Sequence, residues 1–196
     1  MSRRWGCLFP LGIWILVILG FAAYLALQAR SERAHPAAAA PADLCVAIGP
    51  ALFEQLVPHG VPLPGGSYSS GPDAACSFRT GQSRPFGSDA YGLLDVRVLR
   101  HGQVGWDSGA DRAAAALASS CRNTAAAGRF QSDRGLGDDA CSAYSAEGEG
   151  GTAYGSAVIR RGADLFWIDY YTHPGTTDQV RQGVTAVSLA CLGGVS

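Results

Sequence analysis

The chain has 196 residues, a formal net charge of −1 and six cysteines. All 15 basic residues are arginine, and the part from residue 42 onward holds 11 of them against 15 acidic residues, a net charge of −4. Nucleic-acid binding depends on clustered positive charge that neutralises phosphates, so this balance argues against a nucleic-acid partner. After the N-terminal segment, the length allows one folded domain with a sizeable core.

An uncharged, strongly apolar stretch occupies residues 8–27, near the N-terminus. A helix of 20 residues rises about 30 Å, which matches the hydrocarbon core of a bilayer. Arg3 and Arg4 precede the stretch, and positive charge before a span favours a cytoplasmic N-terminus. The sequence therefore predicts a cytoplasmic tail at 1–7, a single-pass plasma-membrane anchor at 8–28, and an extracytoplasmic remainder.

One alternative to a retained anchor is a cleaved signal peptide. A cleaved signal peptide normally has a shorter apolar region followed directly by an A-x-A site; the nearest such site lies at 37–40, well beyond the span, so we favour retention. Ala22 and Ala26 have the spacing that lets two membrane helices pack closely, which permits a homodimer. Residues 29–42 are polar and then Ala/Pro-rich, and they are predicted to be a linker.

The domain predicted for residues 43–196 begins with helical signals. Asp43 can cap a first helix, which Gly49 and Pro50 should divide into two short pieces. A long loop at 59–73 and a short strand at 75–79 follow. Residues 91–99 alternate between apolar and polar side chains, as in a half-buried strand.

The second half of the domain carries two capping boxes. The first, at Ser108 and Asp111, opens a helix that reaches about Cys121, and the second, at Thr176 and Gln179, opens the final helix. Three strands lie between these helices, joined by glycine-containing hairpin turns; their ranges are 140–146, 152–160 and 164–172. The predicted order is α-β-β-α-β-β-β-α, an α+β fold with an antiparallel sheet of about five strands and helices on one face.

Five cysteines follow the apolar stretch, at Cys45, Cys76, Cys121, Cys141 and Cys191. None belongs to a C-x-x-C motif or lies at metal-ligand spacing from a histidine, so we expect no metal site and no cofactor. Widely spaced cysteines in an exported domain favour disulfides. We predict Cys45–Cys76 and Cys121–Cys191, which leaves Cys141 free, although the spacing alone permits other pairings.

Few residues suggest catalysis. The segment Gly135-Leu136-Gly137-Asp138-Asp139-Ala140 fits G-x-G-x-x-A, but it follows a helix and enters a strand, the reverse of a dinucleotide site. We interpret it as a tight turn. Asp138 or Asp139 acting with His173 would make an envelope hydrolase, the weakest of the functional alternatives, which requires their side chains to lie within hydrogen-bond reach of each other.

The densest functional signal is the aromatic strand at 165–171. Strand alternation places Trp167, Asp169 and Tyr171 on one face of the sheet, where Arg97 of a neighbouring strand can add charge. Aromatic side chains with polar groups are favoured at binding surfaces. These four residues are the predicted ligand or partner surface.

Several features together resemble a known family. Cys45 on the first helix, Cys76 on the first strand, the turn at 135–140 and a C-terminal helix with Cys191 are similar to exported actinobacterial domains of unknown function. More distantly, they are similar to the extracellular sensor domain of mycobacterial serine/threonine kinases. The resemblance covers about residues 43–192 and implies an envelope location and a one-sided α+β sandwich, without catalytic residues. This chain differs in that it has no lipobox and no kinase domain.

The sequence therefore predicts a non-catalytic, membrane-anchored binding or sensing module of the cell envelope, with an unknown envelope ligand or protein as its partner. A structural or assembly protein is the main alternative.

Overall fold

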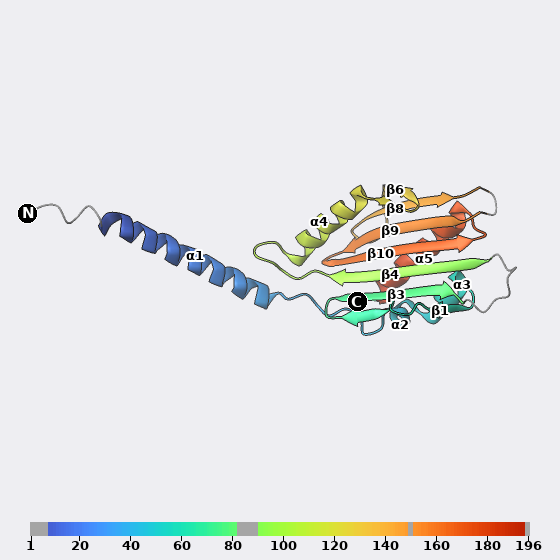
Figure 1. Ribbon diagram of the computed structural model, residues 1–196, viewed down its shortest axis with the longest axis horizontal. Helices are drawn as coiled ribbons and strands as arrows, with labels where there is room; N and C mark the ends of the chain where they lie inside the picture. Colours follow the sequence, from blue (N-terminus) through green and yellow to red (C-terminus); the bar gives the residue numbers. More distant parts are fainter. Residues whose placement is uncertain (1–7, 82–89, 149–150, 195–196) are drawn as a thin grey trace, which may run out of the picture.

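The protein is described by a computed structural model that covers residues 8–81, 90–148 and 151–194 (Figure 1). A long N-terminal helix, α1 (Leu8–Ala34), leads into one end of an elongated domain that combines a sheet with four shorter helices. Those helices are α2 (Leu44–Ile48), α3 (Pro50–Leu56), α4 (Gly109–Arg122) and α5 (Thr177–Gly194). The mixed α+β character predicted from the sequence is confirmed.

Helix α1 is long and apolar enough to cross a membrane over Ile13–Ala34, and its side chains there are not buried in the protein. A signal sequence satisfies the same criteria of length and composition. The predicted tail at 1–7 lies outside the described residues. Helix α1 continues through Ala34, and Ala40 is 9% exposed within the main core. The segment 29–42, predicted to be a linker, is therefore helical in its first part and packed against the domain at Ala40.

The sheet is antiparallel and has eight strands, in the order β1-β3-β4-β10-β9-β8-β7, with β2 also paired to β3. Five long strands fall close to the predicted ranges: β3 (Asp73–Thr80), β4 (Tyr91–Arg100), β8 (Asp139–Ala146), β9 (Ala153–Arg161) and β10 (Asp164–His173). Three short strands lie at the edges: β1 (Gly60–Pro62), β2 (Tyr68–Ser70) and β7 (Gln131–Asp133). The predicted count of about five strands and the predicted element order are therefore wrong. Three-residue strands are too short to show a periodic pattern, so the sequence did not reveal them.

A separate two-stranded ribbon follows α4. It consists of β5 (Thr124–Ala125) and β6 (Gly128–Arg129), which pair with each other and not with the main sheet.

Local signals set the helix ends as predicted. The Val46 N–H donates to Asp43 Oδ1 at 3.0 Å, which caps α2. Gly49 has a φ of 103°, a conformation that favours glycine, and it separates α2 from α3. Ser108 and Asp111 form the reciprocal capping box of α4. These contacts are local in sequence, which explains why spacing alone predicted them.

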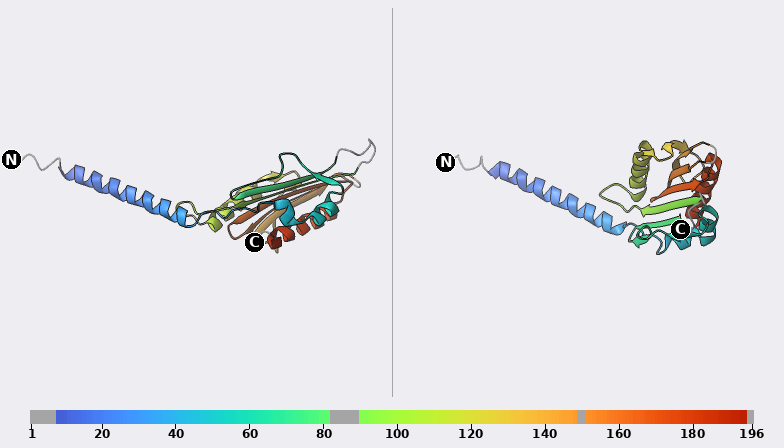
Figure 2. Two further views of the ribbon diagram at one scale, coloured as in Figure 1. Left: turned by 90° about the horizontal axis from the view of Figure 1, so that it is seen from below. Right: turned by 45° about the vertical axis from the view of Figure 1, so that its right-hand side comes forward.

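One face of the sheet packs against α2, α3 and α5, which lie side by side (Figure 2). Alternate residues of β10, namely Phe166, Ile168 and Tyr170, are at most 5% exposed in this layer. Val180, Val184 and Val187 of α5 meet them with no exposed surface. Burial of these side chains supplies the main hydrophobic stabilisation of the domain.

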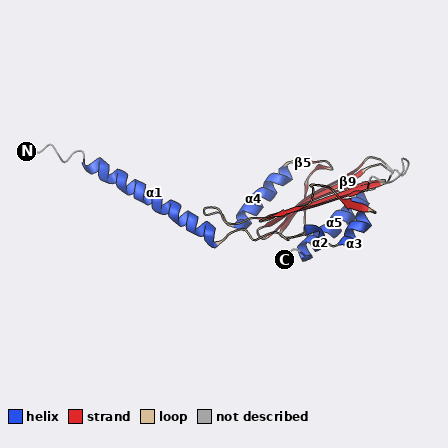
Figure 3. Cartoon of the chain, turned by 60° about the horizontal axis from the view of Figure 1, so that its bottom comes forward, coloured by secondary structure: helices blue, strands red, loops and turns tan. Residues whose placement is uncertain are grey.

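Helix α4 lies on the opposite face of the sheet (Figure 3). Its Leu117 packs with Val158 and Leu165, and Trp167 contributes to the edge of this smaller cluster. The prediction that all helices cover one face is therefore wrong. The alternation of β10 explains the arrangement, because Leu165 points away from Phe166 and needs its own apolar cover.

Two disulfides join the helices to the sheet. Cys45 of α2 is bonded to Cys76 of β3, which is the predicted pair. Cys121 of α4 is bonded to Cys141 of β8, so the predicted Cys121–Cys191 bridge is wrong, and Cys191 rather than Cys141 is the free cysteine among the described residues. Helices α4 and α5 lie on opposite faces, so the sheet separates Cys121 from Cys191. Burial raises the pKa of the Cys191 thiol to about 12.

Candidate functional site: an acidic pair on the open face of the sheet

The part of the α4-side face that α4 leaves uncovered is called the open face below. It is formed by β3, β4, β10 and β9, and it faces the viewer in Figure 1. The four residues predicted from the sequence, Trp167, Tyr171, Asp169 and Arg97, all lie on this side of the sheet, on the adjacent strands β10 and β4. Trp167 is directly opposite Arg97 across this strand pair.

The strand register arranges the open face in three rows. Trp167 and Arg97 form the first row, Asp169 is paired with Asp95 in the second, and Tyr171 is paired with Leu93 in the third. Successive rows are two residues apart, which corresponds to about 7 Å along the strand. The acidic row therefore lies between two aromatic rows.

Arg97 is held in place by two neighbours. Its Nε and Nη2 donate to the two carboxylate oxygens of Asp73 at 2.9 and 2.6 Å. Its guanidinium also lies over the Trp167 ring, 5.4 Å from the ring centre. The hydrogen bonds from Arg97 hold the pKa of Asp73 below its usual value. Because the bidentate geometry and the ring contact restrict its rotamers, Arg97 is a fixed and already neutralised charge.

Asp169 is the least favourably placed charge on the open face. It accepts a hydrogen bond from the Ser156 hydroxyl of β9. Burial raises the pKa of Asp169, the Ser156 hydrogen bond lowers it, and the negative charge of Asp95 raises it. Among the described residues, no salt bridge reaches Asp95 or Asp169. Two facing carboxylates without a cation repel each other, so this pair does not stabilise the fold.

The third row forms one side of a hollow of about 620 Å³ at the end of the sheet away from α1. Tyr171 meets Tyr154 edge to face, with ring centres 5.0 Å apart. Tyr91, which also lines the hollow, is 48% exposed. Partly exposed tyrosines next to carboxylates present both apolar area and hydrogen-bonding groups, a combination that is enriched at binding surfaces.

Part of the Trp167 side chain is packed within the domain. Its indole N–H donates to the Ser120 hydroxyl of α4 at 3.3 Å, and the ring packs against the cluster beneath α4. Trp167 therefore lies at the boundary between α4 and the open face.

Three residues that complete this surface, Asp95, Ser156 and Tyr154, were not predicted from the sequence. The alternation of residues 91–99 indicated that Asp95 shares a face with Arg97, but the pairing of β9 and β4 with β10 has no local signal.

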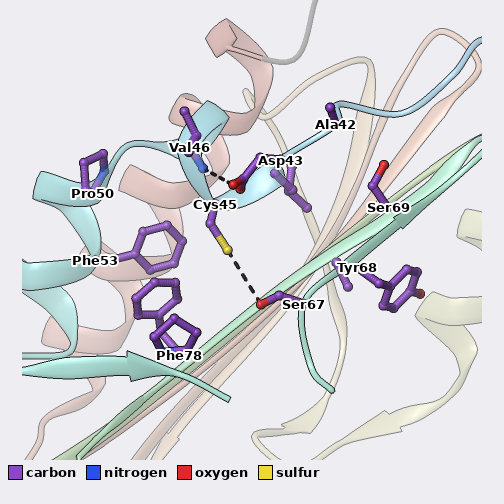
Figure 4. A pocket seen from close by; sticks show the side chains of 13 residues that line it. Ala42, Asp43, Cys45, Val46, Pro50, Phe53, Ser67, Tyr68, Ser69 and Phe78 are labelled. Carbon is purple, nitrogen blue, oxygen red and sulfur yellow. Dashed lines mark hydrogen bonds between the residues drawn. The ribbon is translucent and has the colours of Figure 1, made fainter. Parts of the chain in front are cut away.

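A second concave feature lies beside the first disulfide (Figure 4). It is a groove of about 490 Å³ between α2 and α3 on one side and β1, β2 and β3 on the other. Phe53 and Phe78 stack at its base with ring centres 4.3 Å apart, and Val46, 69% exposed, lies at its rim. The groove is mainly apolar and has the size of a small-molecule site.

The polar groups around this groove are already used within the chain. Asp43 caps α2, the Ser69 hydroxyl donates to the Pro41 carbonyl at 2.9 Å, and the Ser67 hydroxyl accepts from the Ser77 N–H at 3.2 Å. Tyr68 points away from the cavity (Figure 4). The groove can therefore accept apolar groups but offers little to orient them.

The residues of the hydrolase alternative lie at opposite ends of the sheet. Asp139 aligns through Arg160 with Leu165 of β10, and His173 is eight residues further along the same strand, about 26 Å away. Asp138 and Asp139 instead contact Arg160 at 3.2 and 2.7 Å. The structure does not bring the acids and the histidine together.

The predicted turn at 135–140 has the expected geometry. Gly137 has a φ of 63°, and a Cβ atom there would lie 2.4 Å from the Arg160 carbonyl oxygen. A side chain at position 137 would collide with the backbone of Arg160, so this position requires glycine, as expected for a tight turn. Within the described ranges, no group of three or more His, Cys, Asp or Glu side chains is placed to hold a metal ion.

No protein-family model, no curated protein and no solved structure matches this chain. The resemblance to exported actinobacterial domains stays a prediction.

Proposed function

We propose that this protein is a membrane-anchored, non-catalytic binding module that recognises a partner protein of the cell envelope through the open face. The domain lies outside the cytoplasm, held at the plasma membrane by α1, with the N-terminus on the cytoplasmic side. The observation that carries the proposal is the pair of Asp95 and Asp169, which lies between the rows of Trp167 and Tyr171 and which no salt bridge of the described residues reaches.

The charge of this pair defines the chemistry of the partner. Asp169 lies on a central strand, where burial disfavours its charged form, and groups with perturbed pKa values cluster at functional sites. An arginine or lysine side chain of a partner would neutralise both carboxylates. It would also lie beside the aromatic rings, which attract cations. The partner surface should therefore present an exposed basic side chain.

The apolar groove supports this proposal less well, because its rim lacks polar groups available to orient a ligand. An assembly role through the anchor, including the homodimer permitted by Ala22 and Ala26, stays a prediction.

Photo-crosslinking in intact cells tests the proposal. A photoreactive amino acid replaces Tyr171 in the full-length chain, and in a mapping control it replaces Leu189, which is 57% exposed on α5. We expect a discrete crosslinked product from position 171 and none from 189. Asp169→Asn should remove most of this product because it removes the charge that the partner neutralises. Asp178→Asn, which removes one charge from the exposed first turn of α5, should leave it unchanged.

The proposal is wrong if Asp169→Asn and the unchanged chain give the same product in equal yield. It is equally wrong if position 189 captures the same partner as efficiently as position 171. Folding of each variant is checked by its circular dichroism, so that loss of crosslinking is not confused with loss of structure.

A further inference from the structure

The loop between β4 and α4, residues 101–108, reaches toward α1 at the anchor end of the domain (Figure 1). Its two large apolar side chains are turned outward: Val104 is 50% exposed and Trp106 is 63% exposed. A loop tip with an exposed valine and tryptophan is unfavourable in water. Because the loop lies beside α1, the position of α1 indicates which surface covers Val104 and Trp106.

Specific contacts fasten this loop to the last turns of α1. Gln103 Nε2 donates to Ser31 Oγ at 2.6 Å, and the Gly105 N–H donates to Glu32 Oε1 at 2.7 Å. A Cβ atom at Gly102 would lie 2.3 Å from the backbone nitrogen of Ala37, so the loop backbone packs directly against the chain that follows the helix. Backbone packing and two hydrogen bonds thus join the loop to the end of α1.

The same packing sets the level of Trp106 along α1. Its ring contacts the ring of Tyr24, with centres 6.3 Å apart. Tyr24 lies three residues before the end of the apolar stretch 8–27, about 4.5 Å along the helix axis. If α1 crosses the bilayer, Tyr24 lies where hydrocarbon meets headgroups. Trp and Tyr are enriched at this level because their rings are apolar and their N–H or O–H groups remain hydrated.

We propose that the folded domain makes a second contact with the membrane, in which Val104 and Trp106 insert into the interfacial layer of the outer leaflet beside α1. This inference rests on the proposed function, since it requires α1 to be retained as an anchor. In this seated arrangement, both α1 and the loop 101–108 hold the domain against the membrane surface. The strands lead away from the bilayer, and Tyr171 lies at the distal half of the sheet, available to a partner.

Depth-dependent fluorescence quenching tests the contact. The full chain is reconstituted into phosphatidylcholine/phosphatidylglycerol vesicles whose lipids carry a spin label either near the headgroup or deep in the acyl chain. All variants carry Trp5→Phe and keep Trp167. One adds Trp14→Phe, a second adds Trp14→Phe and Trp106→Phe, and a third adds Trp106→Phe alone. Differences between them isolate the emission of Trp106 and of Trp14 without disturbing the fold, because Trp14 and Trp106 are both mostly exposed.

We expect the shallow label to remove most of the Trp106 emission and the deep label to remove much less. Trp14, within the span, should be quenched more strongly by the deep label. If Trp14 is quenched and Trp106 is not, the result supports the membrane anchor and contradicts the second membrane contact. If neither is quenched, the anchor itself is wrong, and the proposed location fails with it. Trp106 emission that is shielded from both labels and changes on dilution of the protein in the bilayer would indicate a second copy and overturn the lipid contact.

A release variant adds an independent readout. Glu32→Ala combined with Gln103→Ala removes two contacts between the loop and α1 while leaving the sheet unaltered. The shallow-label quenching of Trp106 should fall several-fold in this variant, and the quenching of Trp14 should not change. Equal Trp106 quenching in the release variant and the unchanged chain would show that α1 does not position the loop, which overturns the seated arrangement.

Discussion

The two faces of β10 differ although the same backbone carries both. Phe166, Ile168 and Tyr170 are buried under α2, α3 and α5, whereas Asp169 and Tyr171 remain partly exposed beyond the end of α4. The covered face contains what a core requires, which is apolar volume with no unpaired charge. The open face contains a carboxylate whose ionisation burial disfavours. The comparison indicates that one face maintains the fold and that the other is available for recognition.

The largest expected effect separates the two faces by stability. Phe166→Ala removes a fully buried ring and leaves a cavity, so it should lower the free energy of unfolding by about 3–5 kcal/mol. Tyr171→Ala, on the open face of the same strand, should lower it by about 1 kcal/mol through loss of the Tyr154 contact. Urea denaturation followed by circular dichroism measures both. Similar losses for the two variants would contradict the assignment of Tyr171 to a surface.

The second effect concerns α4, the helix that covers the part of the sheet next to the open face. Replacing Cys121 and Cys141 together by alanine removes the bridge between α4 and β8, and the free energy of unfolding should fall by about 3 kcal/mol because the unfolded chain gains freedom. Hydrogen exchange should increase in α4 and remain unchanged in α5, which is anchored in the main core. Cys191→Ala is the matched control, since it removes a buried sulfur without a cross-link. Equal acceleration in both helices would show that the two faces are not independent.

The smallest effect is a gain in stability that depends on pH. Burial raises the pKa of Asp169 in the folded state, so the folded chain holds this proton more tightly than the unfolded chain. Stability therefore falls as pH rises from the unfolded value near 3.8 through the folded pKa. Asp169→Asn removes this loss while its amide oxygen still accepts from Ser156. The variant should match the unchanged chain at low pH and be more stable than it at neutral pH.

Urea titrations of the two chains across this pH range give the difference directly. A difference that is constant with pH would mean that the Asp169 charge is not penalised in the fold. Together with the crosslinking experiment, the variant distinguishes a residue kept for recognition from one kept for stability: the first predicts a more stable protein that has lost its partner.

Some features of this protein were determined by the sequence alone, because the interactions behind them are local. The uncharged stretch at 8–27 determined a helix long enough to span a membrane. Period-two alternation indicated the strand at 91–99, and glycine-containing turns bounded the strands at 140–146, 152–160 and 164–172. Asp43, Ser108 and Gly49 determined helix ends through contacts within a few residues. The four predicted surface residues also followed from alternation, since strand geometry alone places neighbours two apart on one face.

Other features were decided by tertiary structure. Leu165 required cover on its own side, so α4 packs opposite α5, and this separation directed Cys121 to Cys141 and left Cys191 buried alone. The pairing of Asp95 with Asp169 depends on the register of β4 with β10, and the short edge strands depend on β3 and β8 as templates. These contacts join residues far apart in the chain. Their energies depend on which surfaces meet, and no local pattern of residue types contains that information.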